Sequence, residues 1–367
     1  MSRIPFDPVE VENAVEVPGR FGRVSKKYKT PITPKENYRM IYNREVPLWL
    51  PVSGDSLGIT PRIDADNIAR CFAFEANPLT EEETEKLAVD GYEDKFGVTW
   101  IYVPSAFGSM VKPGNPILKD VNDWKNVIKM PDVDSWDWEG TKASNANYVS
   151  TDSWMTATIL TGFFERLISL MDFDNAALAL IDEDQKDAVH ELFDYLADVY
   201  IKMIDKYIWA YNINALSLHD DWGAQRAPFF SLATVREMIV PYVKKVVDYC
   251  HSRGIFLDMH SCGKNEMLVP AYIEAGCDSW SGQPINDREF IFANYAGKLI
   301  LTMESDLVVV PDQPVDPEEA KASAKRFVDR FLPDYANKPV FASGGMGAPV
   351  EFIDALYSES RKAFNPA

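Results

Sequence analysis

The sequence predicts an α/β protein, a TIM (β/α)8 barrel with an N-terminal extension. Strand patterns alternate with helix patterns through the C-terminal half of the chain, which indicates a parallel sheet. Polar residues follow nearly every predicted strand and rarely precede one, as they do when one rim of a barrel carries the chemistry. An open, doubly wound sheet would gather these residues at a switch point instead. The 367 residues accommodate a barrel of about 250 residues with insertions.

The composition favours a folded protein with a large core, since 46% of the residues are hydrophobic and 12% are aromatic. The formal net charge of -19 opposes binding to nucleic acid, and the dense basic run at residues 20–29 is short. No apolar stretch is long enough to span a bilayer, and the N-terminus has no signal-peptide pattern. We therefore expect a soluble, cytoplasmic protein without a nucleic-acid or membrane partner, whose four cysteines are reduced.

Residues 1–43 form the predicted N-terminal arm, and residues 44–367 form the predicted barrel. The arm is rich in Pro, Val, Glu and Lys without a clear period. We expect it to wrap the barrel or to meet a partner subunit, which leaves a homodimer open. Residues 48–53 fit a buried strand, and residues 71–76 and 98–103 fit further strands.

The C-terminal half gives clearer patterns. Apolar residues three and four apart predict helices over residues 189–207 and 232–246, and Pro241 is expected to kink or split the second. Asp316 followed by Pro317 predicts another helix start. The sequence predicts strands at residues 155–160, 212–218, 255–259, 277–280, 299–303 and 340–343, and a final helix from about residue 349.

His260 and Cys262 stand two residues apart at the end of a predicted strand. In extended backbone their side chains leave the same side and can converge on one ion, at roughly 2.0 Å for nitrogen and 2.3 Å for sulfur, as in zinc sites. The alternative is that Cys262 is a small buried hydrophobe and that His260 packs or hydrogen-bonds. The sequence contains no Cys-x-x-Cys, so a metal bound here would occupy an open, catalytic site.

His219, Asp220 and Asp221 follow another predicted strand. The adjacent acids are candidate catalytic residues, because they could bind a cation, orient a ligand histidine, or act as acid or base. The alternative is that one acid caps a helix while the other faces solvent. Trp222 and Arg226 beside them would suit a planar or anionic ligand.

Other predicted strand ends also carry candidate residues. Glu304 could supply an oxygen ligand or a general acid, or it could be a salt-bridged rim residue. Phe163 and Phe164 could line a substrate pocket. Glu165 and Arg166 beside them could simply form ion pairs with other charged side chains. The remaining candidates are a substrate-binding Gln283 and a glycine-rich loop that could hold phosphate, with Gly344, Gly345 and Gly347. No dinucleotide or P-loop fingerprint is present.

Taken together, four motifs resemble those of the uroporphyrinogen decarboxylase superfamily, which contains the decarboxylase and the corrinoid-linked methyltransferases. The resemblance runs from about Arg44 to Lys362 and is closest in character to the methyltransferase branch. The decarboxylase binds a propionate-rich tetrapyrrole with arginines after its first strand. Residues 50–58 of this chain contain no Arg, which disfavours decarboxylation of uroporphyrinogen. The motifs are Gly162-Phe163-Phe164-Glu165-Arg166, Asp220-Asp221-Trp222-Gly223, His260-Ser261-Cys262-Gly263 before Glu274-Ala275-Gly276, and Ser343-Gly344-Gly345.

The methyltransferase branch implies zinc held by a His-x-Cys pair and by a later cysteine in the last strand's loop. His260 and Cys262 match the pair, but Met346 or a neighbouring glycine stands at the later position. The resemblance therefore needs a substitute ligand. Glu304 is preferred on position, and the other candidates are Asp221, His219 and Cys277.

The resemblance implies that a reduced corrinoid cobalt attacks a methyl carbon while zinc stabilises the departing atom. A His-Cys-Glu ligand set suits an oxygen leaving group, so we expect O-demethylation of a methoxy compound, with an aromatic donor favoured by the aromatic content. The chain lacks an Asp-x-His-x-x-Gly segment, so a separate corrinoid protein is the expected partner.

Three alternatives stay open. The first is a metal-free decarboxylase or lyase acting on a smaller acid, in which Asp220 or Asp221 transfers the proton and Arg226 binds the carboxylate. The second is a methylcorrinoid:thiol methyltransferase. The third is a tetrapyrrole or corrinoid carrier without turnover.

Overall fold

A computed structural model describes residues 4–18, 24–104, 108–114, 116–310, 313–345 and 347–366. None of the helices within these ranges is long and apolar enough to cross a membrane. The chain divides into two compact units: unit 1 comprises residues 1–57, 150–154 and 287–367, and unit 2 comprises residues 58–149 and 155–286. Strands β3 (Ser56–Ile59) and β7 (Trp154–Ile159) run from one unit into the other.

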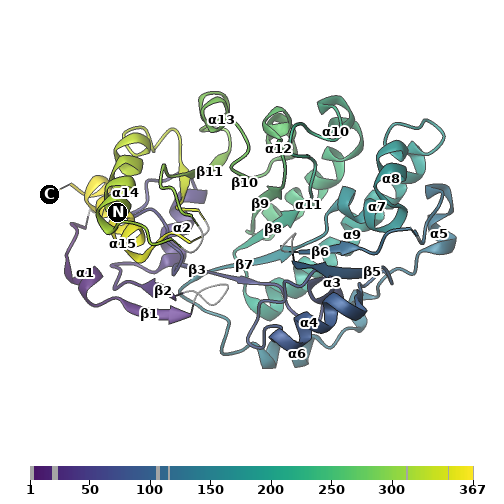
Figure 1. The fold of residues 1–367 in the computed structure, drawn as a ribbon, viewed down its shortest axis with the longest axis horizontal. Helices are drawn as coiled ribbons and strands as arrows, with labels where there is room; N and C mark the ends of the chain where they lie inside the picture. Colours follow the sequence, from purple (N-terminus) through teal and green to yellow (C-terminus); the bar gives the residue numbers. More distant parts are fainter. Residues whose placement is uncertain are drawn as a thin grey trace. The chain divides into compact units, whose positions relative to one another are not determined.

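The core of unit 2 is a parallel sheet in the order β7-β8-β9-β10, with helices between successive strands (Figure 1). This alternation confirms the predicted α/β class. The helix predicted over residues 232–246 is split next to Pro241, as expected. The elements are α7 Phe163–Met171, α8 Phe173–Ala179, α9 Lys186–Tyr211, β8 Ala215–His219, α10 Leu232–Met238, α11 Val240–Ser252, β9 Phe256–Ser261, α12 Val269–Ala275 and β10 Ser279–Gly282.

The two faces of this sheet differ because side chains alternate along a strand. One face, which we call the apolar face, carries fully buried residues: Ala157, Ile159, Leu216, Leu218, Leu257, Met259 and Trp280. Trp280 stacks on Tyr272 of α12 with ring centroids 5.6 Å apart, so helices cover this face. The opposite face, which we call the histidine face, carries His219 and His260.

The part of unit 2 before β7 contains a separate antiparallel sheet in the order β4-β5-β6. The predicted strand at residues 98–103 is β5 of this sheet. The predicted strand at residues 71–76 is wrong, since only an isolated bridge joins Phe74 to Thr60. The elements are α3 Ala65–Ala69, α4 Glu81–Asp90, β4 Tyr92–Glu93, β5 Thr99–Val103, β6 Gly108–Val111, α5 Trp124–Val127 and α6 Trp138–Ser144.

Unit 1 contains the described part of the N-terminal arm and the C-terminal end of the chain. Its strands β11 and β12 are parallel, and β1 and β2 form an antiparallel pair. Asp316 caps α14 as predicted, accepting a hydrogen bond from the Glu318 N–H at 3.2 Å. The elements are α1 Val9–Glu12, β1 Val15–Pro18, β2 Val24–Lys27, α2 Pro34–Tyr42, α13 Arg288–Tyr295, β11 Ile300–Glu304, α14 Pro317–Phe331, β12 Val340–Ser343 and α15 Val350–Phe364.

The described arm packs against α15. Arg361 of that helix has 0% exposure and donates to Glu10 Oε1 at 2.7 Å and Oε2 at 2.8 Å. The ring of Tyr28 stacks on Tyr357 at 4.2 Å. The described part of the arm therefore packs on its own chain, and contact with a partner subunit stays a prediction.

The predicted strand at residues 48–53 is wrong. This segment is buried but irregular, because side chains satisfy its backbone groups. Asn37 Oδ1 accepts from the Leu48 N–H at 2.8 Å, and Asp55 Oδ2 accepts from the Val52 N–H at 2.9 Å. An apolar run alone does not distinguish this arrangement from a strand, which begins only at Ser56.

Candidate metal centre

Four side chains of unit 2 converge on one point: His219, Asp221, His260 and Cys262. Their ligand atoms all lie within 4.8 Å of one another. The predicted pair of His260 and Cys262 is thus brought together, and His219 and Asp221 complete the cluster. The sequence predicts Asp221 as a candidate catalytic residue and offers both His219 and Asp221 as substitutes for the missing zinc ligand.

The register of two neighbouring strands creates this cluster. His219 ends β8 directly opposite His260 on β9, and their rings stack with centroids 4.8 Å apart. Asp221 and Cys262 each follow two residues later, in the loops beyond these strands. A Cβ on Gly263 would lie 2.1 Å from the Gly223 carbonyl oxygen, so only glycine lets the two loops approach so closely.

Two separations within the cluster match those around a zinc ion, and all four ligand atoms lie within 4.8 Å of one another. Bond lengths of 2.0–2.3 Å in a tetrahedron separate ligand atoms by roughly 3.3–3.8 Å. Cys262 Sγ lies 3.5 Å from His260 Nε2, and His219 Nε2 lies 3.7 Å from Asp221 Oδ1. Imidazole, thiolate and carboxylate are the ligand types that zinc takes in proteins. The residues present therefore fit the predicted metal.

Glu165 and Arg70 orient the His219 ring through its other nitrogen, Nδ1. Glu165 Oε2 lies 2.6 Å from His219 Nδ1, and Glu165 Oε1 accepts from Arg70 Nη1 at 3.0 Å. A carboxylate on one ring nitrogen keeps the proton there and leaves the other nitrogen's lone pair free for a metal. The arrangement thus aims His219 Nε2 at the cluster.

Charge and burial shift the pKa of these groups in different directions. Burial disfavours the charged forms of Glu165 and His219. However, Arg70 and His219 lower the pKa of Glu165 to about 2, and Glu165 raises the pKa of His219 well above its usual range. Burial lowers the pKa of His260 to about 3, and the nearby His219 charge acts in the same direction. The neutral His260 ring is ready to bind a metal.

Asp220 points away from the cluster, although it is adjacent to Asp221 in sequence. Its carboxylate has 0% exposure and accepts from the backbone N–H groups of Phe163, Phe164 and Glu165 at 2.8–3.1 Å. These are the first residues of α7, so Asp220 caps that helix. Burial, with the Glu165 charge next, raises the pKa of Asp220 to about 7. In the structure Asp220 caps α7 and Asp221 belongs to the cluster, and the catalytic role of each residue stays a prediction.

The aromatic residues predicted to line a substrate pocket are fully buried. Phe163 packs between Phe193 and Tyr200 with centroids 5.4–5.5 Å away. Trp222 stacks on Tyr272 at 4.9 Å, and its Nε1 donates to Asp220 at 2.8 Å. Phe164 likewise has 0% exposure. Substrate contact by these rings stays a prediction, and their packing within unit 2 does not favour it.

The remaining predicted residues lie in several places. Arg226 is exposed, and Gln283 accepts from the Gly263 N–H at 2.8 Å. Glu304 belongs to unit 1, where its Oε1 accepts from Arg288 Nη2 at 2.6 Å. Its role as a metal ligand stays an untested prediction, while the four groups of unit 2 form a cluster without it. Met346 lies outside the described residues.

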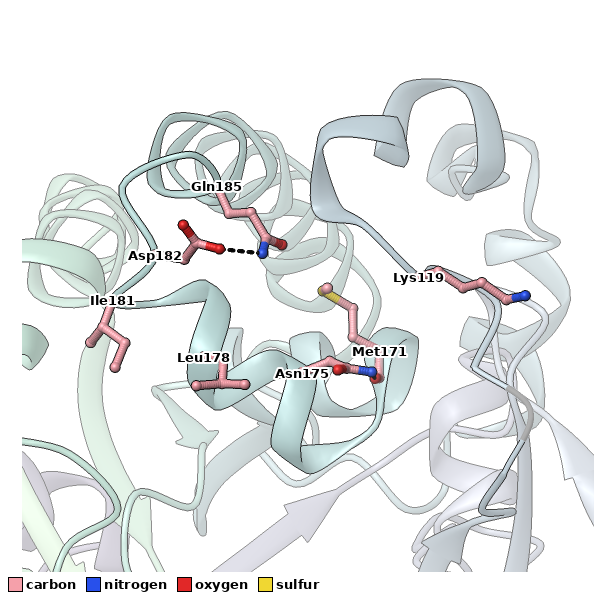
Figure 2. A pocket seen from close by; sticks show the side chains of 7 residues that line it. All are labelled: Lys119, Met171, Asn175, Leu178, Ile181, Asp182 and Gln185. Atoms are coloured by element: carbon pink, nitrogen blue, oxygen red, sulfur yellow. Dashed lines mark hydrogen bonds between the residues drawn. The ribbon is translucent and has the colours of Figure 1, made fainter.

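A pocket of about 350 Å³ also opens on unit 2 (Figure 2). Its wall combines apolar side chains with Asp182 and Gln185, which are joined by a hydrogen bond of 2.8 Å. None of the residues predicted from the sequence lines it, and the four-residue cluster lies elsewhere. The lining residues are Lys119, Met171, Asn175, Leu178, Ile181, Asp182 and Gln185.

Comparison with known proteins supports the fold and the family. Residues 154–324 match the family described as Uroporphyrinogen decarboxylase (URO-D), which confirms the resemblance predicted from the motifs. A methyltransferase from Methanosarcina mazei is similar over 91% of this chain and 99% of its own, with 16% identity and a TM-score of 0.54. The family match and this likeness confirm the predicted TIM-barrel class.

Two further solved structures are similar to a lesser degree. A dihydropteroate synthase from Xanthomonas albilineans has 12% identity and a TM-score of 0.27, covering 45% of this chain and 57% of that one. A xylanase from Gloeophyllum trabeum has 12% identity and a TM-score of 0.35, covering 62% of this chain and 79% of that one. No curated protein sequence matches the chain.

Proposed function

We propose that this protein is a zinc-dependent methyltransferase that moves a methyl group from a methoxy compound to the cobalt of a corrinoid held by a separate protein. The observation that carries the proposal is the cluster of two imidazoles, a thiol and a carboxyl at the ends of adjacent barrel strands. The family match and the likeness in fold to a methyltransferase support it.

His219, His260 and Cys262 would hold the zinc, and His219 takes the place first assigned to Glu304. Three protein ligands leave one position open for the donor's oxygen. A set with a single thiolate keeps the ion electrophilic, which suits an oxygen leaving group. When bound, zinc supplies a Lewis acid that stabilises the negative charge developing on that oxygen.

The proposed reaction breaks one C–O bond and forms one C–Co bond. The methyl carbon leaves the donor's oxygen for the cobalt of the reduced corrinoid, and this cobalt supplies both electrons of the new bond. The electrons of the C–O bond stay on the oxygen, which takes up a proton and departs as an alcohol or phenol. No redox step within this chain is needed.

Asp221 is the group placed to deliver that proton. Its Oδ1 accepts from the Cys262 N–H at 2.6 Å and lies 3.7 Å from His219 Nε2, so the carboxyl borders the ligand position. Burial, and next the Glu165 charge, raise the pKa of Asp221 above its usual value. Asp221 therefore takes the role of general acid.

The test combines metal analysis with methyl transfer. We expect about one zinc per chain and loss of the Co(I) absorbance when the protein, reduced cobalamin and anisole are mixed. His260→Ala and Cys262→Ala should each weaken zinc binding more than 100-fold. Structural zinc sites with four ligands bind the ion with roughly 10–16 kcal/mol, which is about 3 kcal/mol for each ligand lost. Lys244→Ala, which breaks a surface ion pair, is the control.

Two results would contradict the proposal. A protein without zinc that decarboxylates a small acid would support the lyase alternative. A zinc protein that transfers methyl groups only from methylcobalamin to a thiol would support the thiol methyltransferase.

A further inference from the structure

A continuous polar row crosses the histidine face just below the metal cluster. The registers place Thr158 opposite Ser217, Ser217 opposite Asp258, and Asp258 opposite Ser279, on four successive strands. Ser217 and Asp258 each precede a histidine ligand by two residues. Since a strand rises about 3.3 Å per residue, the row lies roughly 6–7 Å deeper than the ligands.

This row is unusual for the inside of a barrel. Layers of Val, Ile and Leu fill most TIM-barrel interiors. Here the row contains two serines, a threonine and an aspartate, and the large apolar residues on the same face, Trp154 and Phe256, lie at the start of their strands. Thr158, Ser217 and Asp258 are half-buried rather than sealed in the core. A polar surface next to a reaction centre is a surface that a ligand can use.

The hydrogen bonds show which ligand groups the row can accept. Hydroxyl groups of three serines donate to the Asp258 carboxylate: Ser279 to Oδ1 at 2.6 Å, Ser281 to Oδ2 at 2.9 Å, and Ser217 to Oδ2 at 3.5 Å. Their hydrogens are directed at Asp258, so the half-buried Ser217 hydroxyl oxygen and the Asp258 carboxylate present acceptors to the histidine face. Strands β7–β10 contain no Lys or Arg. The row is therefore complementary to hydrogen-bond donors and repels anions.

We propose that this row binds the methyl donor and selects a methoxy compound that carries a hydroxyl or amino group about 6–7 Å from its methyl carbon. The inference rests on the proposed function, because it assumes that the reacting methyl group lies at the metal cluster. It adds a substrate class: neutral or cationic donors with a distal hydrogen-bond donor, rather than carboxylated ones. A para-hydroxylated methoxyarene has the required length.

The test is a ranking of three probes by calorimetric binding to the zinc-loaded protein. We expect 4-methoxyphenol to bind about tenfold more tightly than anisole, because a hydrogen bond to a charged group has about this effect. The anion 4-methoxybenzoate should bind most weakly. Asp258→Asn should reduce the preference for 4-methoxyphenol over anisole to about twofold or less and improve 4-methoxybenzoate.

The control variant is Asp248→Asn. It removes a carboxylate of α11 that pairs with Lys244 at 2.9 Å on the surface and is not part of the row. It should leave the ranking unchanged. If Asp258→Asn does not fold, Thr158→Val removes one hydroxyl from the same row and should weaken 4-methoxyphenol more than anisole.

Three outcomes would overturn the inference: equal affinities for the three probes, tightest binding of 4-methoxybenzoate, or a ranking that survives Asp258→Asn. Each is read from binding and not from turnover. Failure of the proposed function would appear separately, as absence of zinc or of methyl transfer from every probe.

Discussion

The apolar face of β7–β10 carries fully buried apolar side chains and, near its end, the buried Ser261, whereas the histidine face carries hydroxyls, a carboxyl and two imidazoles beyond Trp154 and Phe256. The two sets alternate along the same strands, so each strand contributes to both. The apolar face stabilises unit 2 by burying surface against helices. The polar side chains of the histidine face contribute less of this burial, but they provide groups that can bind a metal or a substrate. Substitutions on the two sides should therefore change different quantities.

The largest expected effect is at Trp222, which follows β8 and packs on Tyr272 of α12, the residue that also covers Trp280 of the apolar face. Trp222→Ala removes a ring with 0% exposure that stacks on Tyr272, and we expect a loss of about 3–5 kcal/mol in the free energy of unfolding. Urea unfolding measures this loss. The folded fraction should keep its zinc affinity. A stable variant that has lost donor binding would instead support the sequence-based assignment of Trp222 to the substrate.

An intermediate effect, on zinc affinity, is expected at Glu165, which contacts His219. Glu165→Gln should weaken zinc binding by about 10–100-fold, because the group that orients His219 loses its charge. Chelator competition measures the affinity, and the absorption of the Co(II)-substituted protein reports the ligand geometry. Glu191→Gln, which alters a surface pair with Lys125, is the matched control. Unchanged affinity and an unchanged Co(II) spectrum would remove Glu165 from the site.

The smallest effect is expected at the exposed Arg226. Arg226→Ala should change the free energy of unfolding by less than about 0.5 kcal/mol, as is usual for surface positions. It should leave the affinity for 4-methoxybenzoate unchanged in calorimetry. A selective loss of affinity for that anion would restore the role in carboxylate binding expected from the sequence.

The local pattern of the sequence was sufficient for the strands of the C-terminal half and for one candidate metal-binding pair. Alternating and helical periods depend on neighbours a few residues away, so β12 is found at the predicted residues 340–343 and β9 within about two residues of its prediction. His260 and Cys262 share one side of one strand end, which is again a local property. The family motifs are also contiguous stretches of sequence.

Tertiary structure decided the rest, because strand register and burial depend on residues far apart in the chain. Only the pairing of β8 with β9 places His219 opposite His260 and so supplies an additional candidate ligand. Only the approach of α7 shows that Asp220 caps a helix while its neighbour Asp221 joins the cluster. The sequence by itself determined a barrel with a His-x-Cys pair at its rim, and long-range packing determined which side chains surround that pair.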